Sequence, residues 1–346
     1  MHGLCIIALA VALCAAEVEE ATLRRQASEQ PGSFAANRRL AEYYIRHNQI
    51  SAALPWLEKA ESLDPSNYDN DYDLALARLE TKNPAGARKL LEEMLSRQDR
   101  AELHNLLGDV EEAEGHVQEA AQQYETAARM DPSEKNLFDL GSDLMRHRGF
   151  EPALKVFVFA TGRYPQSSRL RVGLGTADYA LGQYDEAVES LCQAVDLDPK
   201  DTKALDFLGK MYDVSPRFAS EVTKRLARFV QIYPDNAAAN YYYALSLRKR
   251  ALAPGTDTSQ ADAEKLLLRA VALKPQYAEA HFELGLLYED EKRDTKAMRE
   301  YETTIQLGGA DLSKAHYRLG RLYQKSGQPV LAQKEFDAFE ALKGKP

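Results

Sequence analysis

The chain has 346 residues, of which 45% are hydrophobic and 28% are charged, which is ordinary for a folded protein. Its net charge is −9 and its pI is near 5.4, which argues against a nucleic-acid-binding protein because those normally carry a basic face. The length alone would suggest two or three domains, but the repeats described below remove that expectation, because a repeat array has no single enlarging core.

The N-terminal residues 4–16 (LCIIALAVALCAA) form an unbroken apolar run. As a helix this run spans about 20 Å, which is too short for a hydrocarbon core of about 30 Å. Small residues close the run and the acidic Glu17 follows, although only the amino terminus and His2 supply positive charge ahead of it. We therefore predict a signal peptide over residues 1–16 and an exported chain, periplasmic or extracellular. The alternative is membrane attachment through an uncleaved N-terminus or a lipid-modified Cys14.

Residues 17–33 are polar and compatible with a helix. Leu23 and Pro31 lie 34 residues before Leu57 and Pro65, so this stretch keeps the register of a second helix without a first one. We expect either a helix that caps a helical stack or a flexible linker.

From Phe34 onward the sequence repeats itself nine times as two short amphipathic helices. The repeat is marked by a small residue that opens each second helix: Ala53, Ala87, Ala120, Ala153, Ala187, Val222, Ala263, Ala297 and Ala332. Successive steps are 34, 33, 33, 34, 35, 41, 34 and 35 residues. The array therefore spans residues 34–346.

One unit gives the pattern most clearly: His281-x2-Leu284-Gly285-x2-Tyr288, followed by Ala297-x3-Tyr301. This resembles the tetratricopeptide repeat family, whose unit is W-x2-L-G-x2-Y, then A-x3-F, then P. The resemblance covers about residues 34–343, and the main departure is that no unit keeps Trp at the first position. It implies an all-α fold, a right-handed superhelical solenoid.

Four local features carry their own expectations. Gly108 stands in mid-helix, which predicts that the backbone of the second helix crosses there. Ser215 and Pro216 predict the start of the second helix in the sixth unit, as an N-cap followed by proline. The extra residues around 253–259 predict an exposed loop, and Cys192 is expected in the core.

Catalytic and ligand-binding motifs are missing from the sequence. It contains no His-x3-His pair, no Cys-x2-Cys pair and no phosphate-binding glycine loop. His104, His281 and His316 occupy the Trp position of the repeat, so packing explains them. We predict that the protein is not an enzyme and has no catalytic residue, metal site or cofactor.

The resemblance also implies a concave groove lined by the first helix of each unit. The residue after the Trp position would point into it: Arg38, Tyr72, Asn105, Phe138, Val172, Asp206, Tyr241, Phe282 and Tyr317. One helical turn later come Glu42, Leu76, Asp109, Ser142, Thr176, Lys210, Leu245, Leu286 and Arg321. Five of the first nine are aromatic, which favours a surface that buries apolar side chains of a partner. The competing interpretation is that these rings bury one another.

We therefore predict a protein-interaction scaffold that binds a protein or peptide in this groove, without nucleic acid or a small-molecule cofactor. The candidate site residues are Tyr72, Asn105, Phe138, Asp206, Lys210, Tyr241, Phe282, Tyr317 and Arg321. The set with which some family members grip a terminal carboxylate is not assembled, because Asp206 lies one turn before Lys210. The alternative function is a structural subunit of a larger envelope assembly, with self-association through Phe336 and Phe339 of the last unit.

Overall fold

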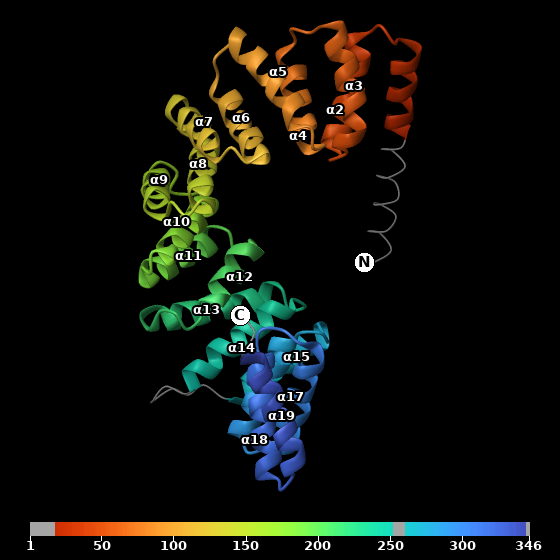
Figure 1. The fold of residues 1–346 in the computed structure, drawn as a ribbon. Helices are drawn as coiled ribbons and strands as arrows, with labels where there is room; N and C mark the ends of the chain where they lie inside the picture. The colour runs from red at the N-terminus through yellow and green to blue at the C-terminus, as the bar shows by residue number, and fades with distance from the viewer. Residues whose placement is uncertain (1–17, 252–259, 344–346) are drawn as a thin grey trace. The chain divides into compact units, whose positions relative to one another are not determined.

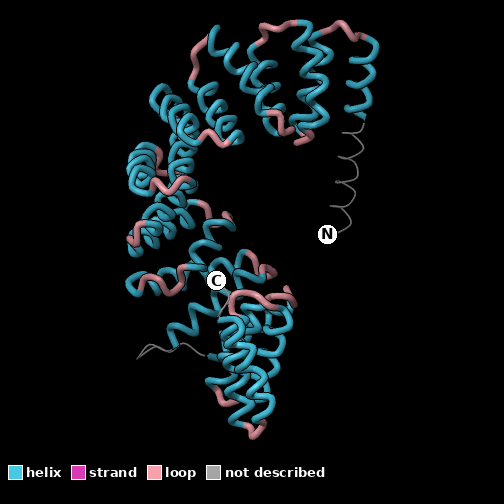
Figure 2. The backbone as a smooth tube through the Cα atoms, viewed as in Figure 1, coloured by secondary structure: helices cyan, strands magenta, loops and turns pink. Residues whose placement is uncertain are grey.

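The computed structural model describes residues 18–251 and 260–343, and within them it contains helices and short turns but no strand (Figures 1 and 2). This confirms the all-α repeat fold. The predicted signal peptide and the predicted loop around residues 253–259 lie outside the described residues. None of the described helices is both long enough and apolar enough to cross a membrane.

The helices follow one another in pairs after a first helix over residues 18–29. In chain order they are α2 (Phe34–Arg46) and α3 (Ile50–Leu63); α4 (Tyr68–Glu80) and α5 (Pro84–Arg97); α6 (Ala101–Glu114) and α7 (Val117–Met130); α8 (Glu134–Arg146) and α9 (Phe150–Arg163); α10 (Ser168–Ala180) and α11 (Tyr184–Leu197); α12 (Thr202–Lys210) and α13 (Ala219–Ile232); α14 (Ala237–Ala251) and α15 (Gln260–Leu273); α16 (Ala278–Asp290) and α17 (Asp294–Leu307); α18 (Leu312–Lys325) and α19 (Pro329–Lys343). A short 3-10 turn over Pro216–Phe218 precedes α13.

The chain divides into two compact units, residues 1–156 and 157–346. In both, the small residue that opens each second helix is in the core. All nine of these residues, from Ala53 to Ala332, are at most 3% exposed. A small side chain at this point lets paired helices approach closely, which is why the period is readable in the sequence.

The stretch expected to be a cap or a linker is a helix. Ala27 is completely buried, and Leu23 packs against the core of the first helix pair. The hydroxyl of Tyr44 donates a hydrogen bond to Glu20 at 2.9 Å. Residues 18–29 thus cover one side of α2 and α3.

Buried asparagines hold successive pairs together. Asn70 donates to the carbonyl of Leu57 inside α3, and Asn136 donates to the carbonyl of Asp131, the C-cap of α7. Helix ends leave their last carbonyls without intrahelical partners, so the Asn136 amide also satisfies a group that would otherwise lack one.

The expectation that a backbone crosses at Gly108 is wrong. The ring of Tyr124 lies over this glycine, and a Cβ at position 108 would come within 2.7 Å of a ring carbon. The same arrangement brings Phe336 over Gly320. The glycine makes room for the aromatic residue of the second helix, because a methyl group and a buried ring cannot share that space.

The expectation for Ser215 and Pro216 is met only in part, because Ser215 is an N-cap followed by proline, but of a 3-10 turn rather than of the α-helix. They open the 3-10 turn, and α13 begins only at Ala219. The hydroxyl of Ser215 donates to Asp185 and so does not cap a helix. The α12 helix is correspondingly short and ends at Lys210.

Candidate functional site

The second unit contains a hollow of about 520 Å³ formed by α14, α16, α18 and α19, which we call the α14–α18 hollow. It is lined by Tyr212, Tyr241, Leu245, Phe282, Glu283, Leu286, Asp311, Lys314, Tyr317, Arg318 and Phe339. Five of these positions belong to the predicted groove: Tyr241, Leu245, Phe282, Leu286 and Tyr317. First helices of three successive pairs therefore supply side chains to one concave surface.

The apolar residues of this hollow differ in depth. Phe282 is 4% exposed and Leu245 is 6% exposed, whereas Tyr317 is 41% exposed. The ring of Tyr317 lies 5.2 Å from that of Phe339, centroid to centroid. Phe282 is therefore buried against its neighbours, as the competing interpretation expects, but Tyr317 is not. The exposed part of the Tyr317 ring can still be buried by a bound partner.

Charged groups of both signs border the same hollow. Glu283 pairs with Arg248, Lys314 pairs with Asp311 at 2.8 Å, and Arg318 bonds Glu289 at 3.3 Å. Burial raises the pKa of Glu283, and the Arg248 charge opposes that shift. The ions are already paired, so the surface offers apolar contact area and no net excess of one sign.

The first unit contains a smaller hollow of about 420 Å³, lined by Arg38, Tyr68, Asp69, Tyr72, Asp73 and Glu102. Arg38 donates to Asp73 at 2.6 Å, and the hydroxyl of Tyr68 donates to Glu102 at 2.9 Å. Of the predicted site residues it contains only Tyr72. This hollow is lined mainly by charged residues and tyrosines.

The remaining predicted site residues line neither hollow. Asn105 is 2% exposed, donates to Asp139 at 3.1 Å and accepts from Lys135. Its hydrogen-bonding capacity is therefore used within the chain. Phe138 is half-buried on α8, and on α12 Asp206 is half-buried and Lys210 exposed. Arg321 is exposed on α18.

Several lining residues of the α14–α18 hollow were not predicted from the sequence. Lys314 lies three positions before Tyr317, so the helical period could have indicated it, whereas Arg318 directly follows Tyr317 in the chain. Tyr212 and Phe339 could not be found this way. Tyr212 follows the early end of α12, and Phe339 lies on a second helix, α19.

The three histidines at the Trp position make polar contacts. In each, Nδ1 lies close to a side-chain oxygen of the residue 19 positions later: His104 to Gln123 at 2.6 Å, His281 to Glu300 at 2.7 Å and His316 to Glu335 at 2.6 Å. Packing alone therefore does not explain them. The hydrogen bond to Glu300 is the main reason that the pKa of His281 is raised. Cys192 is buried as expected, which raises its pKa to about 11.

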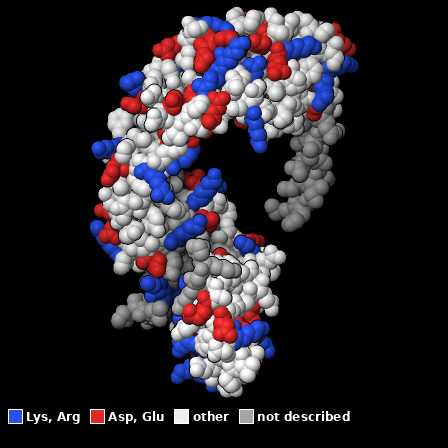
Figure 3. Space-filling model, in the orientation of Figure 1, with Lys and Arg blue, Asp and Glu red and all other residues white. Residues whose placement is uncertain are grey.

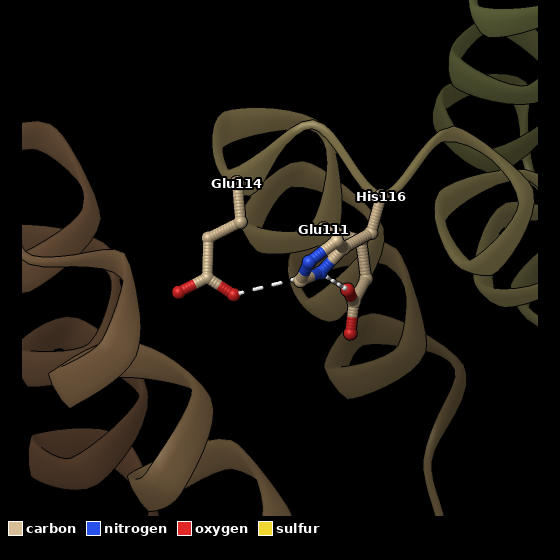
Figure 4. A group of neighbouring side chains, drawn as sticks. All are labelled: Glu111, Glu114 and His116. Carbon is tan, nitrogen blue, oxygen red and sulfur yellow. Dashed lines mark hydrogen bonds and ion pairs between the residues drawn. The ribbon is translucent and has the colours of Figure 1, made fainter.

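Two groups of three side chains bring carboxylates and an imidazole together in the first unit: Glu111, Glu114 and His116, and Glu112, Asp143 and His147. Figure 4 shows the first group, in which Nδ1 of His116 lies 2.9 Å from Glu111 and 3.8 Å from Glu114. In the second, burial and then the charge of Glu112 raise the pKa of Asp143 to about 6. Neither group corresponds to a metal-ligand motif in the sequence.

Charges are mixed on the surface in view. In each unit, Figure 3 shows Lys and Arg interspersed with Asp and Glu, without a large area of one sign. Nucleic-acid-binding faces concentrate Lys and Arg. The face in view has no such concentration.

Comparisons with known proteins indicate a repeat family. A family model described as tetratricopeptide repeat matches residues 72–135, 138–202 and 261–311. The C-terminal part of a TPR repeat-containing protein from Cytophaga hutchinsonii has a similar structure: 16% identity, TM-score 0.55, 70% of this chain and 97% of that chain covered. A tetratricopeptide repeat protein from Parabacteroides merdae is similar at 14% identity and TM-score 0.51, with 72% and 92% covered. A search of curated protein sequences gave no match.

Proposed function

The chain belongs to the tetratricopeptide repeat family, and we propose that it is a non-catalytic scaffold that binds a segment of a partner protein in the α14–α18 hollow. The family supports a role in protein interaction. The place of binding is our own inference, as is the absence of catalysis.

The observation that carries the proposal is the convergence of Tyr241, Leu245, Phe282, Leu286 and Tyr317 on one hollow. A bound segment would place apolar side chains against Leu286 and Tyr317, above the deeper Phe282. Aromatic residues give a large contact area for little loss of conformational entropy, so a few of them can supply most of the binding energy. The paired ions at the border would favour a partner with polar residues beside its apolar ones.

Selection of peptides from a displayed library on the full chain tests this. We expect enriched peptides with an apolar anchor residue. Tyr317→Ala should weaken their binding about tenfold or more, because it removes the exposed part of the aromatic surface. Tyr317 is a better probe than Phe282, whose burial means that truncation would also damage the core.

The matched control is Tyr184→Ala. Tyr184 is 47% exposed on α11 in the same unit and does not line the hollow. It should leave binding unchanged, with the far-ultraviolet helix signal intact in both variants. The proposed place of binding is contradicted if both variants lose binding equally, or if neither variant loses it.

Self-association is a second candidate function, favoured by α19. Val330 is 81% exposed and Leu331 is 40% exposed on this helix, while Phe336 and Phe339 are half-buried against α18. If this face joins two copies, light scattering will detect dimers that Val330→Glu abolishes. A monomer at high micromolar concentration would remove this candidate.

We also propose export of the chain, on the basis of the apolar run at residues 4–16. The measurement is the N-terminal sequence of the protein recovered outside the cytoplasm. A mature N-terminus near Glu17 is expected. Recovery of an intact Met1 from the cytoplasm alone would contradict export, and an intact N-terminus in the membrane fraction would favour attachment.

A further inference from the structure

The group formed by Glu112, Asp143 and His147 combines residues from two helix pairs. Asp143 and His147 are four positions apart, at the end of α8 and its C-cap, so they share one face. Glu112 comes from α6. Nε2 of His147 lies 2.5 Å from Oε1 of Glu112 and 3.7 Å from Oδ1 of Asp143. Three potential ligand atoms therefore face one point.

One oxygen of the buried Asp143 carboxylate is not satisfied by the described residues. Its side chain is 2% exposed, and its Oδ1 atom has no hydrogen-bond partner among the described residues. Nε2 of His147 can donate one proton at most, and Glu112 is the nearer acceptor. A buried carboxylate oxygen without a donor is costly, so a further positive group at this point would be stabilising.

In the neighbouring group of Glu111, Glu114 and His116, both carboxylates have a cationic hydrogen-bond donor. There the guanidinium of Arg88 binds both carboxylates, with Nη2 2.7 Å from Glu111 and Nε 3.0 Å from Glu114. Nη2 also lies 3.2 Å from Nδ1 of His116. Arg88 thus occupies the position that a cation would take. The Asp143 group has no guanidinium in that position among the described residues.

Arg146 instead binds the Glu112 oxygen that does not contact His147. Its Nη1 donates to Oε2, and Oε1 is left facing His147 and Asp143. A hydrogen bond of this kind orients a ligating carboxylate without occupying the metal position.

We propose that Glu112, Asp143 and His147 bind one divalent transition-metal ion, with Zn²⁺ as the best fit. Zn²⁺ accepts both imidazole nitrogen and carboxylate oxygen as ligands, whereas Mg²⁺ and Ca²⁺ prefer oxygen alone. Tetrahedral Zn²⁺ places ligand atoms about 3.3 Å apart, close to the Asp143–His147 spacing. The Glu112–His147 contact must open by about 1 Å. The His147 side chain, 31% exposed at the end of its helix, has room to move.

Such an ion would join α6 to α8 and therefore connect two neighbouring repeats. Three protein ligands would leave a fourth position for water. Because both ligating helices belong to the first unit, the site is independent of the α14–α18 hollow. Failure of one proposal leaves the other intact.

Calorimetric titration of the metal-free full chain with Zn²⁺ tests the proposal, and Co²⁺ absorption reports the ligand geometry. We expect one ion per chain. Asp143→Asn and His147→Gln should each weaken binding at least tenfold and change the Co²⁺ spectrum, while far-ultraviolet circular dichroism shows that both variants remain folded. Zn²⁺ should also raise the Tm of the wild type, and a chelator should reverse this.

The matched control is His116→Gln, in the group that Arg88 already fills. It should bind Zn²⁺ as the wild type does. The proposal is overturned if the wild type binds no Zn²⁺ below millimolar concentration, or if the Asp143 and His147 variants bind as tightly as the wild type. Loss of binding only in His116→Gln would also overturn it. If Asp143→Asn fails to fold, Glu112→Gln replaces it in the same comparison.

Discussion

The ring of Tyr301 lies directly over Gly285, so that a Cβ at position 285 would stand 2.5 Å from the ring carbon Cε1. Tyr301 is completely buried and its hydroxyl donates to Glu289 at 2.8 Å, so the ring has little freedom to move. The relationship joins α16 to α17. It explains why the repeat needs glycine in mid-helix, where glycine alone would be unfavourable.

Gly285→Ala should destabilise the second unit by about 1–2 kcal/mol, because the cost of overpacking exceeds the gain in helix propensity. Gly162→Ala is the control, since a methyl group at this helical position on α9 meets no atom within 4 Å. It should be neutral or stabilising by up to about 1 kcal/mol. Urea unfolding measures both, and a stabilising Gly285→Ala would refute the packing account.

The turn inside each helix pair supplies a second prediction. Lys82 has a φ of 64° and Gly115, at the same place in the next pair, has a φ of 81°. Lys82 therefore bears a strain that Gly115 avoids. Lys82→Gly should raise the stability of the first unit by about 0.5–1 kcal/mol, and Gly115→Ala should lower it by at least as much. Thermal unfolding of the two variants gives opposite shifts if the turn geometry is as described.

The His281–Glu300 pair predicts a pH dependence. Nδ1 faces the Glu300 carboxylate and Nε2 faces the carbonyl oxygen of Pro275 at 3.1 Å, so only the imidazolium can donate on both sides. The folded pKa of His281 is accordingly raised above 6.5, chiefly by the bond to Glu300. The pair therefore stabilises the fold fully below the unfolded pKa and loses this effect as pH rises through the folded pKa.

Glu300→Gln tests this directly. The stability difference between wild type and variant should be largest near pH 5.5 and should shrink toward pH 8.5 in urea unfolding. Glu125→Gln serves as a control, because Glu125 is exposed on α7 in the other unit. A difference that grows with pH would contradict the assignment of His281 as a cation.

The fold could be read from the sequence because one physical requirement recurs. Each helix pair needs a small residue where its helices meet, and Ala53, Ala187 and Ala297 are all completely buried. The turn before α13 could not be predicted. Asp185, which takes the hydroxyl of Ser215 away from capping, lies 30 positions earlier and belongs to another pair.

Only part of the candidate site could be predicted from the sequence. The repeat spacing placed Tyr241, Phe282 and Tyr317 on one surface. How far each side chain is buried depends on the neighbouring helices, and the repeat period does not predict that. Asn105 satisfied the same rule and is nevertheless bonded inside the chain. The Asp143–His147 pair is visible at helical spacing, yet its third member, Glu112, comes from another repeat and has no motif.

Hydrogen–deuterium exchange of the full chain with and without a selected peptide tests the central claim most directly. The account predicts that bound peptide slows exchange of amides in α14, α16 and α18, which carry most of the lining of the hollow. This protection should be lost in Tyr317→Ala and kept in Tyr184→Ala. Protection confined to the outer face of α19, or to the first unit, would contradict it.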